Sequence, residues 1–101
     1  MPPDPKPAPD LDFAAMRSEI DALDEQILEL VAARIRIVLK VGDYKRARGM
    51  NVYDPERERK MLERLCSQAP EPLDADTVRR IFERLIDESR RIEQHSMGKR
   101  G

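Results

Sequence analysis

The stretch that decides the fold is Leu11–Ala47, LDFAAMRSEIDALDEQILELVAARIRIVLKVGDYKRA. Apolar residues recur in it every three or four positions, at Met16, Ile20, Leu23, Ile27, Leu30, Val31, Val38 and Val41. This period predicts one helix with a single apolar stripe along its length. Gly49, just beyond the stretch, is the kind of residue that ends a helix.

The length of this helix bears on the assembly. A rise of ~1.5 Å per residue makes it ~54 Å long, whereas a compact domain of about 100 residues has a radius of gyration of only ~13 Å. The rest of the chain supplies two shorter helices, which cannot cover the whole stripe. We therefore expect two copies of the chain to form an intertwined homodimer.

Two further helices follow a loop at about residues 48–53. Asp54 is a suitable N-cap, Pro55 suits the first helical position, and this second helix should end before the breaker at residues 69–72. The third helix should open near Asp74. The residues expected to be buried are Met61, Leu62, Leu65 and Cys66 on the second helix, and Val78, Ile81, Phe82, Leu85, Ile86 and Ile92 on the third. The predicted fold is all-α, with three helices per chain.

The composition agrees with a single helical domain. The 101 residues are 39% charged and 40% apolar, with two tyrosines, two phenylalanines and no tryptophan. Sandwich and barrel folds usually rely on aromatic and β-branched strands, which this chain lacks. The formal net charge is −1, which argues against nucleic-acid binding because such proteins normally carry a basic excess.

Several other classes of site are disfavoured by residue counts. Cys66 is the only cysteine and His95 the only histidine, so an internal disulfide is excluded and zinc chemistry is not expected. We expect no metal or other cofactor, and a reduced cytoplasmic setting fits. The first ten residues lack the apolar core of a signal peptide, and no apolar run approaches the ~20 residues of a membrane span.

The ends of the chain differ from its middle. Residues 1–10 hold five of the eight prolines, which indicates a disordered leader. Residues 98–101, GKRG, are interpreted as a flexible tail. The folded domain is therefore expected at residues 11–97.

Three cations interrupt the apolar stripe of the first helix: Arg17, Arg34 and Lys45. An ion on a core-facing stripe is costly unless it is paired or binds a ligand. Arg34 and Lys45 lie about three turns apart, ~16 Å along one face, so their long side chains could meet one small anion. Arg17 lies ~25 Å from Arg34 along the helix, so it could join that anion only from a partner chain.

The other helices add polar residues at comparable positions. Arg57 and Glu58 follow the Asp54 cap in a first turn, where free N–H groups favour an anion or a hydroxyl. Ser89 and Glu93 are four residues apart on the stripe of the third helix. Each residue alone is ordinary, because basic side chains snorkel to water and first turns are usually solvated. The complete set, however, indicates a small-anion site.

Four segments together resemble the all-helical chorismate mutase family: MRSEIDALDEQILELVAARI at 16–35, VGDYKRARG at 41–49, YDPERERKMLERL at 53–65 and LIDESRRIEQ at 85–94. The resemblance extends from about Phe13 to Met97. It implies an intertwined three-helix dimer with two equivalent sites, which rearranges chorismate to prephenate without a cofactor. Because the chain is short, we expect a monofunctional enzyme on the route to Phe and Tyr.

The resemblance also implies roles for individual residues. Arg34 and Arg17 of the partner subunit should bind the two substrate carboxylates, and Lys45 should contact a carboxylate and the breaking ether oxygen. Arg57 should support these cations, Glu58 and the Asp54 backbone should contact the ring hydroxyl, and Ser89 should assist at a carboxylate. The predicted catalytic residues are thus Arg34, Lys45 and Glu93, and the predicted substrate-binding residues are Arg17, Asp54, Arg57, Glu58 and Ser89.

Glu93 departs from the pattern, because many relatives have a glutamine that donates to the ether oxygen. An amide donates at any pH, whereas a carboxyl donates only when protonated. Other members of the family do use glutamate here. The hypothesis that follows is that protonated Glu93 is the active form.

Two alternatives stay open. An isochorismate-pyruvate lyase shares the fold and acts on a nearly identical dianion, but lyase relatives lack the acidic pair of Asp54-x-x-Arg57-Glu58. A non-catalytic helical dimerisation module would instead use Arg34 and Lys45 in ordinary ion pairs with acidic residues of a neighbouring chain.

Overall fold

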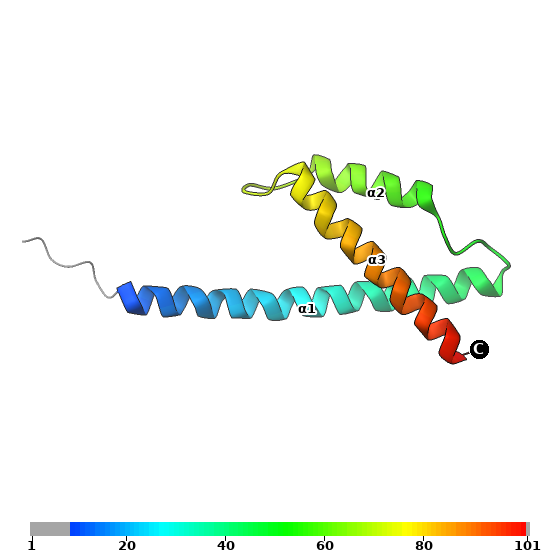
Figure 1. The fold of residues 1–101 in the computed structure, drawn as a ribbon, viewed down its shortest axis with the longest axis horizontal. Coiled ribbons are helices and arrows are strands. Elements are labelled where there is room, and N and C mark those ends of the chain that lie inside the picture. The colour runs from blue at the N-terminus through cyan, green and yellow to red at the C-terminus, as the bar shows by residue number, and fades with distance from the viewer. Residues whose placement is uncertain (1–8, 101) are drawn as a thin grey trace, which may run out of the picture. The chain divides into compact units, whose positions relative to one another are not determined.

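The computed structural model describes residues 9–100, with side chains for residues 12–96. These residues form three helices and no strand: α1 (Pro9–Ala47), α2 (Pro55–Ser67) and α3 (Ala75–Arg100) (Figure 1). The all-helical prediction is therefore confirmed. α1 begins at Pro9 rather than Leu11, and α3 is helical to Arg100, so residues 98–100 of the expected tail are helical. Residues 1–8 and Gly101, which hold most of the expected leader and the end of the tail, lie outside the described residues.

The end of α1 is fixed by its sequence. Gly49 has a φ of 67°, a left-handed conformation that glycine adopts without steric cost. Its N–H donates to the carbonyl of Arg46 at 3.2 Å, and the N–H of Met50 donates to that of Lys45 at 2.8 Å. This pair of bonds is a Schellman motif, which satisfies the last carbonyls of the helix. The prediction that Gly49 stops the helix is confirmed.

Aspartate caps begin the other two helices. A side-chain oxygen of Asp54 accepts from the backbone N–H of Arg57 at 3.1 Å, and Pro55 occupies the first turn, where its missing N–H costs nothing. Asp74 accepts from the backbone N–H of Thr77 at 2.7 Å. The backbone bond from Thr77 lowers the pKa of Asp74 from its ordinary value. Both predicted starting points are confirmed.

α2 and α3 pack against each other, and the apolar residues buried most fully are Met61, Val78 and Ile86. The other expected core residues of the two helices are half-buried, except one. Ile81 is 51% exposed within the described chain, because at ~100° per residue it falls at the edge of the stripe that Val78 and Ile86 share. Its predicted burial therefore depends on the proposed second copy of the chain.

The N-terminal part of α1, residues 12–33, forms a unit of its own. Phe13, Met16, Ile20, Leu23 and Ile27 each keep between 53% and 57% of their surface exposed. The apolar stripe of this unit is thus uncovered within the described chain. Among the described residues, no helix combines the length and apolarity that a membrane span needs.

Candidate functional site

A cavity of about 930 Å³ lies within the unit formed by residues 34–96. Its walls come from the last four turns of α1, the loop at residues 50–54, the first two turns of α2 and the middle of α3. Every predicted site residue except Arg17 lines it, namely Arg34, Lys45, Asp54, Arg57, Glu58, Ser89 and Glu93. Three segments far apart in the sequence therefore contribute polar side chains to one space.

Three of the lining cations have no acidic partner in the described chain. Among residues 12–96, no carboxylate lies within ion-pair distance of Arg34, Lys45 or Arg57. Arg34 Nη2 donates only to the sulfur of Met61 at 3.3 Å, and a thioether is a weak acceptor. Burial and the neighbouring Arg57 lower the pKa of Arg34, while Glu58 opposes this shift. A cluster of uncompensated like charges is what an anionic ligand would relieve.

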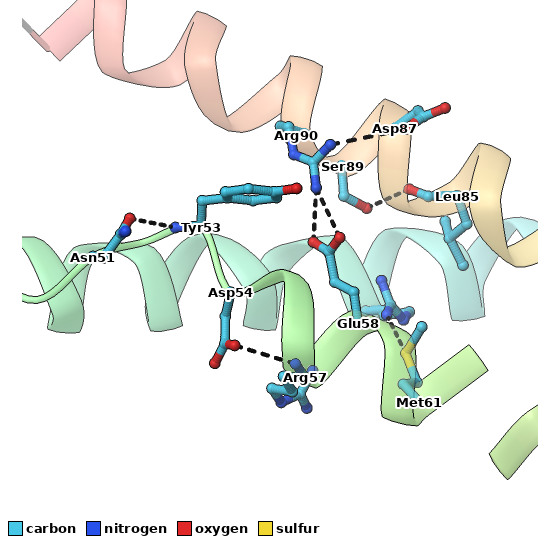
Figure 2. Close-up of polar contacts among 11 residues, drawn as sticks. Asn51, Tyr53, Asp54, Arg57, Glu58, Met61, Leu85, Asp87, Ser89 and Arg90 are labelled. Atoms are coloured by element: carbon cyan, nitrogen blue, oxygen red, sulfur yellow. Dashed lines mark hydrogen bonds and ion pairs between the residues drawn. The ribbon is translucent and has the colours of Figure 1, made fainter. Parts of the chain in front are cut away.

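Glu58, by contrast, is firmly held. Arg90 Nη2, on α3, donates to both of its carboxylate oxygens, at 2.9 and 2.8 Å (Figure 2). The Arg90 guanidinium lies 4.7 Å from the centre of the Tyr53 ring. Hydrogen bonding to Glu58 raises the pKa of Arg90. Neither Arg90 nor Tyr53 was singled out in the sequence, although Arg90 lies one turn beyond buried Ile86, at the stripe spacing that marks Ser89 and Glu93.

Asp54 and Ser89 line the cavity but are already engaged. The Asp54 side chain serves as the cap of α2, so only its backbone remains for the ring-hydroxyl contact assigned to it, and its carbonyl already accepts from the N–H of Glu58. The Ser89 hydroxyl donates to the carbonyl of Leu85 at 2.7 Å, a common use of serine inside a helix. To donate to a substrate carboxylate, this hydroxyl would have to rotate.

Glu93 is buried beside α1, and its Oε2 has no hydrogen-bond partner among the described residues. The nearest cation is Arg46, whose Nη1 lies 4.0 Å away and whose Nη2 bonds to Asp43 at 2.8 Å. Gly42 is what admits the carboxylate, because a Cβ at that position would overlap Glu93 Oε2 and lie 3.1 Å from its Cδ. A buried oxygen without a hydrogen bond is rare in folded chains, and a functional role is one explanation for it.

Arg17 lies outside this unit. Its guanidinium is 5.4 Å from the centre of the Phe13 ring, and no acidic side chain of the described residues pairs with it. The residues that line the cavity thus include every predicted site residue but Arg17.

The arrangement favours binding and electrostatic chemistry. Five cations and three acids line the cavity, and of these cations only Arg46 and Arg90 pair with acids of the described chain. The remaining positive charge suits a small molecule with more than one acidic group. Fixed cations also stabilise negative charge that develops during a reaction, at no cost of reorganisation.

Comparison with known proteins places the chain among similar sequences and structures. The family described as chorismate mutase type II matches residues 16–94. Among solved structures, chorismate mutase (form II) from Thermus thermophilus is 32% identical, with a TM-score of 0.78 over 82% of this chain and 94% of that one. Chorismate mutase from Helicobacter pylori, solved in complex with prephenate, is 27% identical, with a TM-score of 0.77 over 85% and 93%.

Two curated relatives are longer than this chain. The T-protein of Haemophilus influenzae is 37% identical over 73% of this chain, and the bifunctional chorismate mutase/prephenate dehydratase of Escherichia coli is 40% identical over 74%. In each case the matching region is 20% of the relative's length. The chain thus spans about a fifth of these relatives.

Proposed function

The chain belongs to the type II chorismate mutase family, and we propose that it rearranges chorismate to prephenate on the route to Phe and Tyr, in the cytoplasm. The single observation that carries the proposal is the set of cations Arg34, Lys45 and Arg57 around one cavity, unpaired within the described chain. Chorismate is a small ring with two carboxylates, so it would supply the missing negative charge.

The reaction is a unimolecular shift of bonds that needs no base, nucleophile or metal. It needs a compressed conformer of the substrate, and a cation beside the ether oxygen that gains negative charge. In our proposal Arg34 holds one carboxylate, Lys45 contacts a carboxylate and the ether oxygen, and Arg57 reinforces the positive field. These contacts accelerate the reaction only as far as they strengthen in the transition state.

The acidic side of the cavity would recognise the rest of the substrate. We assign Glu58 and the Asp54 backbone to the ring hydroxyl, Ser89 to a carboxylate after rotation of its hydroxyl, and Glu93 to the ether oxygen. Glu93 can donate there only when protonated. Its Oε2 accepts no hydrogen bond from the described residues, which supports this assignment.

We further propose that the enzyme is an intertwined homodimer, in which Arg17 of the partner subunit binds the second carboxylate. Support comes from the uncovered stripe of residues 12–33. Burying apolar surface is worth ~25 cal/mol per Å², so a stripe several turns long favours association strongly. A second copy of the same helix offers a matching stripe.

The experiment is an assay of the purified protein with chorismate and with isochorismate side by side. We expect prephenate from chorismate, and a loss of about 10²–10³-fold in kcat/KM for Arg34→Ala, as for other electrostatic contacts to a transition state. Arg36→Ala is the matched control, because Arg36 is exposed on the same helix and does not line the cavity.

Each outcome bears on one alternative. Release of pyruvate from isochorismate as the main activity would favour the lyase. No turnover of either substrate by the wild-type protein would favour the dimerisation module. Equal activities of Arg34→Ala and Arg36→Ala would contradict the assignment of the cavity.

A further inference from the structure

We propose that Arg90 is a positioning residue, which holds Glu58 in the orientation that accepts a hydrogen bond from the ring hydroxyl of the substrate. Tyr53, in the loop before α2, fixes Arg90 in turn. This inference rests on the proposed function. It concerns two residues that the sequence patterns did not mark and that no role above includes.

The geometry is that of a support for Glu58. One nitrogen, Nη2 of Arg90, sits between the two oxygens of the carboxylate. Each carboxylate oxygen can accept two hydrogen bonds, so this contact leaves acceptor capacity for a hydroxyl donated from the cavity. A glutamate side chain has several rotatable bonds and loses conformational freedom when it is fixed. Arg90 fixes it before the substrate arrives.

Arg90 is itself restrained from several sides. Its guanidinium lies against the Tyr53 ring (Figure 2), and its Nη1 is 4.0 Å from Asp87 Oδ1. Tyr53 is anchored in turn, because its N–H donates to the Asn51 side chain at 3.1 Å. The loop, α2 and α3 are therefore linked through Tyr53, Arg90 and Glu58. A cation over an aromatic ring keeps this contact while one edge of the guanidinium bonds elsewhere.

The support also keeps Glu58 away from the substrate-binding cations. The charge of Glu58 already acts on Arg34 and opposes the lowering of its pKa. If Glu58 were released, it could swing to Arg34 or Arg57, which have no other acidic partner in the described chain. Such a pair would occupy a cation that the substrate carboxylate needs. Arg90 thus keeps Glu58, which accepts from the ring hydroxyl, apart from Arg34 and Arg57, which face the substrate carboxylates.

The test compares neighbouring arginines on α3. Arg90→Ala should lower kcat/KM for chorismate by about 30-fold, the size expected for a charge-assisted hydrogen bond. Arg90→Lys, which keeps a charge but not the flat contact with Tyr53, should lose only a few-fold. Arg91→Ala is the matched control, because Arg91 is exposed and, among the described residues, bonds only to Glu88 in the preceding turn. It should keep wild-type activity.

The decisive readout is a chorismate analogue that lacks the ring hydroxyl. With this analogue the penalty of Arg90→Ala should be several-fold smaller than with chorismate, because Glu58 then has no hydroxyl to accept from and only its pairing with a substrate-binding cation still interferes. Combining Arg90→Ala with Glu58→Gln should likewise add little to the loss from Glu58→Gln alone. A residue that only stabilised the fold would lower the turnover of both substrates equally.

Three results would overturn the inference. The first is an unchanged activity of Arg90→Ala in a protein whose wild type is active, which leaves the proposed function intact. The second is an equal loss on both substrates for Arg90→Ala and for Arg90→Lys, which would make Arg90 purely structural. The third is a wild type that turns over neither substrate, in which case the proposed function and this inference fail together.

Discussion

Residues 12–33 of α1 differ from the unit formed by residues 34–96 in how much of their side-chain surface is buried. The first region is a single helix whose apolar side chains remain about half exposed. The second buries Met61, Val78, Ile86, Ser89 and Glu93, and lines a cavity. One region leaves apolar surface exposed, and the other gathers charged side chains around one space. The difference teaches that apolar surface and clustered charge are kept in separate parts of the chain, and the predictions below disturb one or the other.

The largest effect should come from a charge in the uncovered stripe. Ile27→Asp would place a carboxylate where the dimer proposal requires burial, and the substitution occurs twice in a symmetric pair. Burying an unpaired charge costs several kcal/mol, so we expect a monomer, or an unfolded chain, with no measurable activity. Sedimentation and circular dichroism provide the measurement. Glu25→Gln on the same helix should remain a dimer, and a dimeric Ile27→Asp would contradict the proposal.

The next effect separates activity from stability within the cavity. Gly42→Ala places a Cβ on Glu93 Oε2, and that flexible carboxylate must move away. We expect kcat to fall by about 10–100-fold, while helix propensity favours the variant by up to ~1 kcal/mol. Thermal unfolding and steady-state kinetics on one sample test this. Full activity in Gly42→Ala would mean that the position of Glu93 is unimportant.

Replacing Glu93 by its amide tests whether this side chain acts as a donor. An amide donates whatever the pH, whereas a carboxyl donates only when protonated. We therefore expect kcat of Glu93→Gln at neutral pH to equal or exceed that of wild type, as measured by steady-state kinetics. A variant whose kcat falls by tenfold or more would contradict donation from this position to the ether oxygen.

The smallest effect should come from a cap remote from the cavity. Asp74→Ala removes the acceptor for the Thr77 N–H and should lower the Tm at neutral pH by a few degrees, with no change in kinetics. The pKa of Asp74 is depressed in the folded chain, from an ordinary value of 3.8. Its contribution is therefore present above that value and lost as the pH falls through the folded pKa. A difference in Tm between Asp74→Ala and wild type that is the same at every pH would contradict this account.

Much of the fold could be predicted because its signals are local. The caps at Asp54 and Asp74, the stop at Gly49 and the three-to-four spacing of apolar residues each act within one or two turns. The exposure of Ile81 within one chain was not predictable, because the apolar period does not say how wide a stripe α2 covers. Val78 lies under α2 and is buried, whereas Ile81 lies at the edge of the same stripe.

The sequence marked the cations of the candidate site, but it did not mark the residues that hold Glu58 in place. Arg34 and Lys45 stand out because they interrupt an apolar stripe. Arg90 and Tyr53 do not, since each is ordinary in its own segment, and they meet Glu58 only when the loop, α2 and α3 come together. Ser89 lies on the cavity wall, but its bond to Leu85 depends on a rotamer that no spacing reveals.

The most direct test of the central claim, that sites are completed by both chains, is a mixing experiment. Arg17→Ala and Arg34→Ala should each be nearly inactive. After joint refolding, a mixed dimer has one site that lacks both arginines and one that has both, so random pairing should restore about a quarter of wild-type activity. A mixture no more active than its separate components would show that Arg17 and Arg34 do not serve a shared site.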